Sequence, residues 1–117
     1  MKKAFRMWTN SLDITDGNNE PFYMNNLYDD VNDGVILLKI FERIASEDVV
    51  DWKKANMNPN NKFRKVENCN QVIDIGKKLN FTLVGVGGSD IVNKNKKFIL
   101  AVYWQMMRKD TLNVFLK

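Results

Sequence analysis

Few side chains in this sequence could do chemistry. Cys69 is the only cysteine, and histidine is absent. Without an imidazole, a thiol lacks its usual base for nucleophilic catalysis, and the commonest nitrogen ligand for metals is missing. One cysteine can form neither a zinc site nor an intramolecular disulfide, which fits a reducing cytosolic compartment. We therefore expect Cys69 to be a small buried hydrophobe.

Two short runs resemble ligand-binding loops superficially. Asp29-Asp-Val-Asn-Asp-Gly34 is acidic like a calcium loop, but with Gly34 at position six, Val31 and Ile40 fall at positions three and twelve. Neither offers a side-chain oxygen. Gly85-Val-Gly-Gly88 lacks the Lys-Ser/Thr of a phosphate-binding loop. We therefore expect a binding module rather than an enzyme, with no metal and no cofactor.

Charge is distributed unevenly along the chain. Its 18 basic and 14 acidic residues give a net charge of +4, which is too mild for a dedicated nucleic-acid binder. All charged residues between Asp13 and Asp33 are acidic, whereas Asp110 is the only acid from Lys94 onward. Lys2, Lys3 and Arg6 make the other end basic too. Either the basic ends meet an acidic partner, or they are a solvated surface that clustered by chance.

The spacing of apolar residues predicts an all-α fold with four main helices and short helical connectors. The first helix, over 3–12, buries a face at i, i+3, i+4 and i+7; the second, over 27–45, is broken near Asp33-Gly34. The third covers 62–79, and the fourth starts near Asn95. The third helix has this predicted core seam: Phe63, Val66, Cys69, Asn70, Ile73, Gly76 and Lys77.

The connectors and the last helix complete the prediction. Residues 81–86 have strand propensity but no strand to pair with, so we expect an extended connector. Ser89-Asp90 can cap a short helix that ends near Asn93. The apolar run at 98–107 is shorter than the roughly 20 residues of a membrane span, so we expect a core helix and no membrane partner. Trp8, Trp52 and Trp104 are predicted core or core-edge anchors. We expect the other helices to pack on the 98–107 segment, with Trp104 as its bulkiest side chain.

Four separated blocks resemble the signatures of calponin-homology (CH) domains. The first is Leu27-Tyr-Asp-Asp-Val-Asn-Asp-Gly-Val-Ile-Leu-Leu38, and the second is Lys65-Val-Glu-Asn-Cys-Asn-Gln-Val-Ile-Asp-Ile-Gly76. The others are Leu83-Val-Gly-Val-Gly-Gly-Ser-Asp-Ile-Val92 and Ile99-Leu-Ala-Val-Tyr-Trp-Gln-Met-Met-Arg108. Within the family, the chain most resembles the third CH domain of the fimbrin/plastin family, which opens the second actin-binding tandem. Asn93-Lys94-Asn95 departs from the family, which commonly has a glycine there.

The resemblance implies an actin-filament-binding module that contributes to cross-linking and bundling in a longer fimbrin-like protein. We expect residues 1–117 to be one CH domain of such a protein, a cytoplasmic monomer at the actin cytoskeleton with an adjacent CH domain in the same polypeptide. The alternative is a CH-type adaptor for microtubules or a signalling protein. The residues that the resemblance places at the actin surface are Lys2, Lys3, Arg6, Lys53, Lys54, Arg108, Lys109, Leu112, Phe115 and Leu116. The apolar stripe of Leu112, Phe115 and Leu116 could instead pack on the first helix or on the neighbouring CH domain.

Overall fold

Helices make up the regular structure of this chain. The computed structural model describes the backbone of residues 2–116, without the side chains of residues 2, 47 and 113–116. The elements are α1 (Lys2–Ser11), α2 (Leu27–Val31), α3 (Val35–Ile44), the 3-10 helix η1 (Glu47–Val49), α4 (Lys62–Lys78), α5 (Gly88–Val92) and α6 (Lys96–Leu116). Within the described backbone there is no strand, only an isolated bridge between Thr15 and Pro21. The predicted all-α fold, with four main helices and short connectors, is confirmed.

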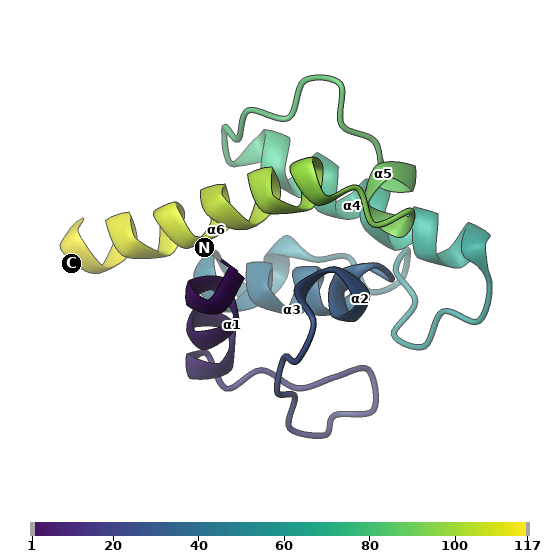
Figure 1. Ribbon diagram of the computed structural model, residues 1–117, viewed down its shortest axis with the longest axis horizontal. Coiled ribbons are helices and arrows are strands. Elements are labelled where there is room, and N and C mark those ends of the chain that lie inside the picture. The colour runs from purple at the N-terminus through teal and green to yellow at the C-terminus, as the bar shows by residue number, and fades with distance from the viewer. Residues whose placement is uncertain (1, 117) are drawn as a thin grey trace.

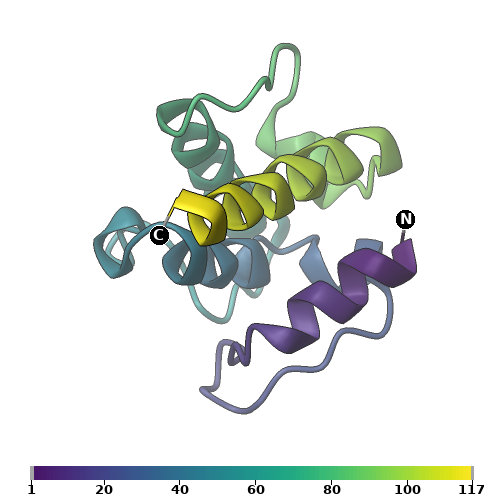
Figure 2. The same ribbon diagram turned by 90° about the vertical axis from the view of Figure 1, so that its left-hand side faces the viewer.

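Helix α6 runs through the middle of the molecule. It packs on α1, α3 and α5, while α4 packs on α3 and α5. Figures 1 and 2 show α1, α2 and α3 on one side of α6 and α4 and α5 on the other, and Figure 1 shows the last turns of α6 reaching past the body of the fold. The first part of α6 is therefore covered by other helices, and its end has a more open setting.

The contact between α1 and α6 centres on Tyr103, which is fully buried. Its ring lies 5.5 Å from the ring of Phe5 and 5.9 Å from that of Trp8 (centroid distances). Its hydroxyl lies 2.6 Å from the hydroxyl of Thr9, which donates to the carbonyl of Phe5 at 2.8 Å. Burial raises the pKa of Tyr103, so the phenol stays protonated. Its hydroxyl and that of Thr9 are hydrogen-bonded to each other inside the core.

The predicted break between α2 and α3 is confirmed, and a close approach by α4 explains it. Gly34 has a φ of 83°, and a Cβ placed there would lie 2.7 Å from the Cβ of Asn68. Gly34 is the N-cap of α3, and just before it the Asp33 carboxylate accepts the N–H of Val35 at 3.0 Å, while burial raises the pKa of that carboxyl. The Asp-Gly pair therefore serves the start of a helix and its packing.

Helix α4 corrects part of the predicted core seam. Val72 and Ile75 are buried together with Cys69 and Ile73, but Phe63 is 68% exposed, and Asn70 and Lys77 are exposed as well. Phe63 stands in the first turn of the helix, whereas the buried residues of α4 begin at Asn68. Burial raises the pKa of the Cys69 thiol to about 12, which confirms a structural rather than a reactive cysteine.

The turn between α5 and α6 holds a lysine in a conformation that favours glycine. Lys94 has a φ of 61°, and its N–H bonds the carbonyl of Ile91 at 3.0 Å, as in a helix C-terminal cap. We expect Lys94→Gly to be more stable than Lys94→Ala by about 1 kcal/mol, because alanine keeps the left-handed strain. Both variants lose the exposed ion pair to Asp29 (2.8 Å), so the comparison isolates the backbone effect. Urea denaturation of the two variants measures it; equal midpoints would contradict it.

No helix in the described part of the chain is both long and apolar enough to cross a bilayer. Groups of three or more side chains suited to a metal ion are also absent from the described residues.

Candidate functional site

The second half of α6 borders an open groove of about 380 Å³. Arg108, Lys109 and Leu112 line it from α6, so the structure brings three of the predicted site residues together. The remaining lining residues come from the end of α4, the connector after it and the preceding turn of α6: Leu79, Asn80, Phe81 and Gln105. Leu112 is 49% exposed, which leaves its apolar side chain available to a partner.

The connector that forms the other wall of the groove is tied to α6. The amide of Gln105 accepts the N–H of Thr82 at 2.6 Å and donates to the Thr82 carbonyl at 3.0 Å. Behind the wall, the ring of Phe81 packs on that of Phe41 at 5.8 Å between centroids. The connector is therefore held by hydrogen bonds at Thr82 and by ring packing at Phe81. No strand forms at 81–86, but the predicted extended connector is wrong for its second half. Residues 83–86 form a turn, in which Gly85 has a φ of 78° and the N–H of Val86 bonds the carbonyl of Leu83 at 3.3 Å. Gln105 is a positioning residue that sequence reasoning missed.

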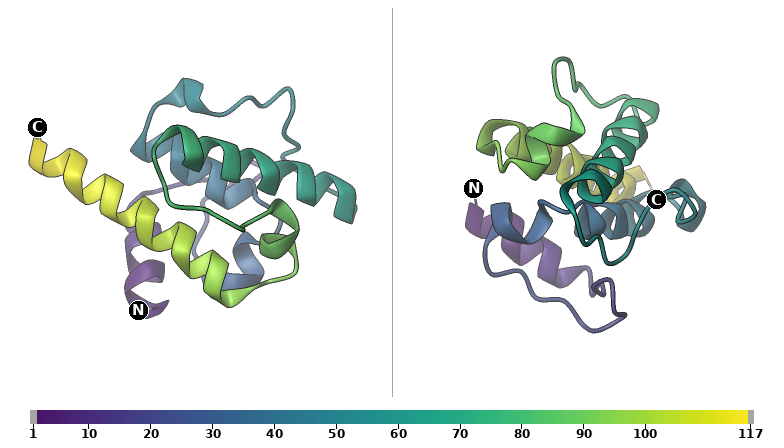
Figure 3. Two further views of the ribbon diagram at one scale, coloured as in Figure 1. Left: turned by 90° about the horizontal axis from the view of Figure 1, so that it is seen from above. Right: turned by 90° about the vertical axis from the view of Figure 1, so that its right-hand side faces the viewer.

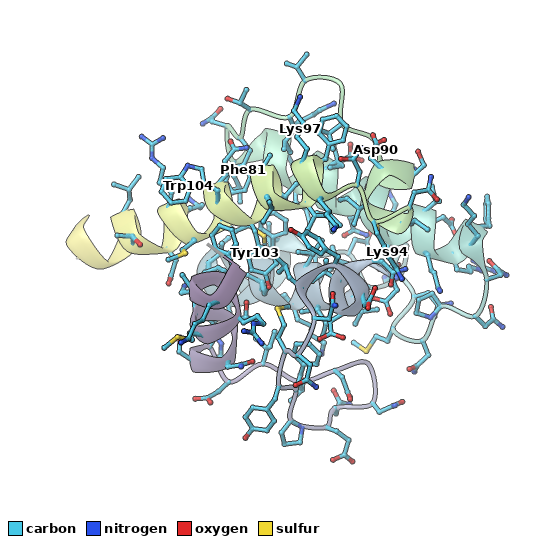
Figure 4. The ribbon with its side chains drawn as sticks, viewed as in Figure 1. Phe81, Asp90, Lys94, Lys97, Tyr103 and Trp104 are labelled. Atoms are coloured by element: carbon cyan, nitrogen blue, oxygen red, sulfur yellow. The ribbon has the colours of Figure 1, made fainter. Side chains whose placement is uncertain are left out.

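Trp104 contradicts its predicted role as a core anchor. It is 49% exposed, whereas its neighbour Tyr103 is fully buried, and Figure 4 shows the two side chains on opposite sides of α6. The reason is helical spacing: Ile99, Val102, Tyr103 and Met106 already fill the buried face at i, i+3, i+4 and i+7. Trp104 therefore lies on the solvent face of α6, one helical turn before Arg108.

Helix α1 supplies a second basic segment of the predicted site. Lys3 is exposed, while the guanidinium of Arg6 is partly engaged, since its Nη1 donates to the carbonyl of Asn25 at 3.3 Å. The indole of Trp8 donates to the carboxylate of Asp110 in α6 at 3.0 Å. This bond fixes α1 across α6 and occupies the only acidic side chain on α6, so the predicted role of Trp8 as an anchor at the core edge is confirmed.

Lys53 and Lys54 do not join the other basic residues. They are exposed in the turn after η1, and Figures 2 and 3 show η1 on the opposite side of the molecule from α1. The turn is held to α3 by the indole of Trp52, which donates to Glu42 at 2.8 Å. Trp52 is thus partly buried, as predicted, and the two lysines form a separate patch.

Three predicted site residues cannot be placed. The side chains of Lys2, Phe115 and Leu116 lie outside the described residues, although the backbone of each belongs to α1 or α6. The apolar stripe at the end of α6 is therefore represented by Leu112 alone.

The electrostatics of the groove suit the binding of another protein. Among the described side chains, the ion pairs are Arg64–Glu67 and Lys94–Asp29, so Arg108 and Lys109 have no carboxylate partner. The groups whose pKa is raised by burial, Asp33, Cys69 and Tyr103, lie away from the groove and have structural roles. Unpaired cations beside exposed apolar side chains are features of a protein-binding surface.

Comparison with known proteins agrees with this description. Fimbrin-2 of Arabidopsis thaliana is 46% identical over 114 residues, which cover 97% of this chain and 16% of that protein. Plastin-3 of Rattus norvegicus is 41% identical over 118 residues, covering 97% of this chain and 18% of plastin-3. The chain thus spans less than a fifth of the length of these curated relatives.

A solved structure extends the agreement to three dimensions. The crystal structure of the actin-crosslinking core of Schizosaccharomyces pombe fimbrin matches with a TM-score of 0.83 and 36% identity, over 94% of this chain and 23% of that one. A sequence profile of the calponin homology (CH) domain matches residues 1–111. With its all-α architecture and the Asp33-Gly34 and Asn68 contacts in place, the chain belongs to the calponin homology domain family.

Proposed function

We propose that this chain is an actin-filament-binding module of a longer fimbrin-like protein, in which it contributes to cross-linking and bundling at the actin cytoskeleton of the cytoplasm. The observation that carries the proposal is the likeness to the actin-crosslinking core of S. pombe fimbrin over 94% of the chain. The identities to fimbrins and plastins support it. We place the chain third among the CH domains of that protein, as a monomeric domain followed by an adjacent CH domain, and assign it no enzymatic activity.

The proposed filament surface is basic and is made of side chains from α6 and α1. Arg108 and Lys109, beside the half-exposed Leu112, form its centre, and Lys3 on α1 extends it. Cationic side chains there would raise the rate of association with an acidic filament and set its register, while Leu112 would add apolar contact. Lys2, Phe115 and Leu116 belong to the proposal through their positions in α1 and α6.

Charge reversal on opposite faces tests the proposal. We expect Arg108→Glu/Lys109→Glu to weaken filament co-sedimentation about tenfold, a loss of about 1.4 kcal/mol in binding. Lys53→Glu/Lys54→Glu makes the same change in charge on the opposite side and serves as the matched control, with an expected change below about twofold. The protein should be the longest natural polypeptide that contains this chain, since linked weak sites gain effective concentration.

Three results would contradict the proposal. Unchanged pelleting of the Arg108/Lys109 variant across a salt series would remove the basic surface from the interaction. An equal loss in both variants would indicate attraction that depends on net charge alone. Pelleting with microtubules but not with actin filaments would favour the adaptor function instead.

A further inference from the structure

The groove beside α6 combines an apolar lining with a cationic rim. Leu79, Phe81 and Leu112 give it apolar side chains, and Arg108 and Lys109 stand on the α6 wall. Its volume of about 380 Å³ is near the lower end of the usual range for binding pockets, which leaves room for about one or two large side chains.

The charge around the groove has one sign. None of its lining residues carries a carboxylate, and neither Arg108 nor Lys109 belongs to an ion pair among the described side chains. Lys77 and Lys78, both exposed, come directly before Leu79 at the end of α4 and extend the positive charge beyond the α4 wall. A segment that fills this groove would gain from acidic side chains on both flanks of its apolar residues.

The walls of the groove are formed before any partner arrives. The double hydrogen bond from Gln105 holds Thr82, and the N–H of Phe81 bonds the carbonyl of Gly76 at 2.9 Å. Gly76 allows this close approach, because a Cβ there would lie 2.6 Å from a methyl group of Leu83. A preformed groove spares a ligand the entropic cost of ordering the connector.

From these features we propose that the groove is a docking site for a short acidic peptide segment of a partner protein, which inserts a large apolar side chain between Phe81 and Leu112. Carboxylates beside that anchor pair with Arg108 and Lys109 on one rim and with the lysines at the end of α4 on the other. The groove shares Arg108, Lys109 and Leu112 with the proposed filament surface. The inference goes beyond filament binding, because its ligand and its test involve no filament.

A peptide titration of the 117-residue chain tests the proposal. The probe is a fluorescein-labelled twelve-residue peptide that carries one Leu-x-x-Phe pair among glutamates. We expect saturable fluorescence anisotropy, with affinity about tenfold lower for Leu112→Ser and for Arg108→Glu/Lys109→Glu. Leu112 is half exposed, so its replacement leaves the core intact. Lys62→Glu, at the exposed opposite end of α4, is the control and should bind as the wild type does.

Control ligands identify what the groove recognises. A peptide with serine in place of the Leu-x-x-Phe pair, and one with lysine in place of glutamate, should each bind at least about tenfold more weakly. Equal binding of the serine peptide, equal loss in Lys62→Glu, or no saturation would each overturn the proposal. Retention of the chain on phosphatidylserine vesicles without peptide binding would overturn it in favour of a lipid surface. Because no filament is present, these failures leave the filament proposal untouched.

Discussion

Replacement of Tyr103 by alanine is expected to lower the free energy of unfolding by about 3–5 kcal/mol, as for other large aromatic side chains in cores. Tyr103 is fully buried, and its ring contacts both Phe5 and Trp8 of α1. Alanine would leave a cavity between α1 and α6 and remove the partner of the Thr9 hydroxyl. A loss of this size is a large part of the roughly 5–15 kcal/mol that stabilises a domain. Urea denaturation followed by circular dichroism measures it.

Two further variants keep this prediction testable if Tyr103→Ala does not fold. Tyr103→Phe keeps the ring but loses the hydroxyl, and Thr9 still has the carbonyl of Phe5 as its acceptor, so we expect a cost of about 1 kcal/mol. Trp104→Ala is the matched control on the other side of α6, with an expected cost of less than about 1 kcal/mol for a half-exposed side chain. A cost at Trp104 equal to that at Tyr103 would contradict the assignment of faces on α6.

Helices α1 and α3 were predictable because their apolar residues recur with a clear helical period. The face of α1 with Phe5 and Thr9, and the break before Gly34, follow from local spacing and backbone chemistry. The family commonly has a glycine near Lys94, a residue type that favours a positive φ, and the structure has Lys94 at a φ of 61°. What periodicity missed depends on the neighbouring helices. Phe63 has the type and spacing of a core residue, but in the first turn of α4 it is 68% exposed.

The candidate site was predictable only in part, because spacing along a helix does not tell where connectors lie. Arg108, Lys109 and Leu112 share one groove, yet the wall opposite them comes from residues 79–81, some thirty positions earlier. Gln105, which fixes that wall, looks in sequence like any polar residue on a helix. The separation of Lys53 and Lys54 from α1 is likewise a property of the whole fold.

The second large effect is expected at Asn68, the first asparagine of the Glu-Asn-Cys-Asn block on α4. This side chain is fully buried and bonds three backbone groups: it accepts the N–H of Asn56 at 2.7 Å and donates to the carbonyls of Asn56 (2.7 Å) and Asp33 (3.0 Å). Asn68 therefore holds the turn before α3 and the loop before α4 against helix α4. Asn68→Ala leaves these groups without that partner, and we expect a loss of about 3 kcal/mol in stability.

Gln71 provides the matched control for Asn68, because it makes similar bonds from the same helix in a more exposed place. Its amide accepts the N–H of Asp51 at 2.7 Å and donates to the Asp51 carbonyl at 3.2 Å. Water can replace these bonds, so Gln71→Ala should cost less than about 1 kcal/mol, whereas water cannot readily reach the groups that Asn68 serves. Chemical denaturation of both variants compares the two losses directly. Equal losses would mean that burial does not change how much a side-chain hydrogen bond from α4 stabilises the fold. The Asn68 contacts would then not explain how the connections before α3 and α4 are held in place.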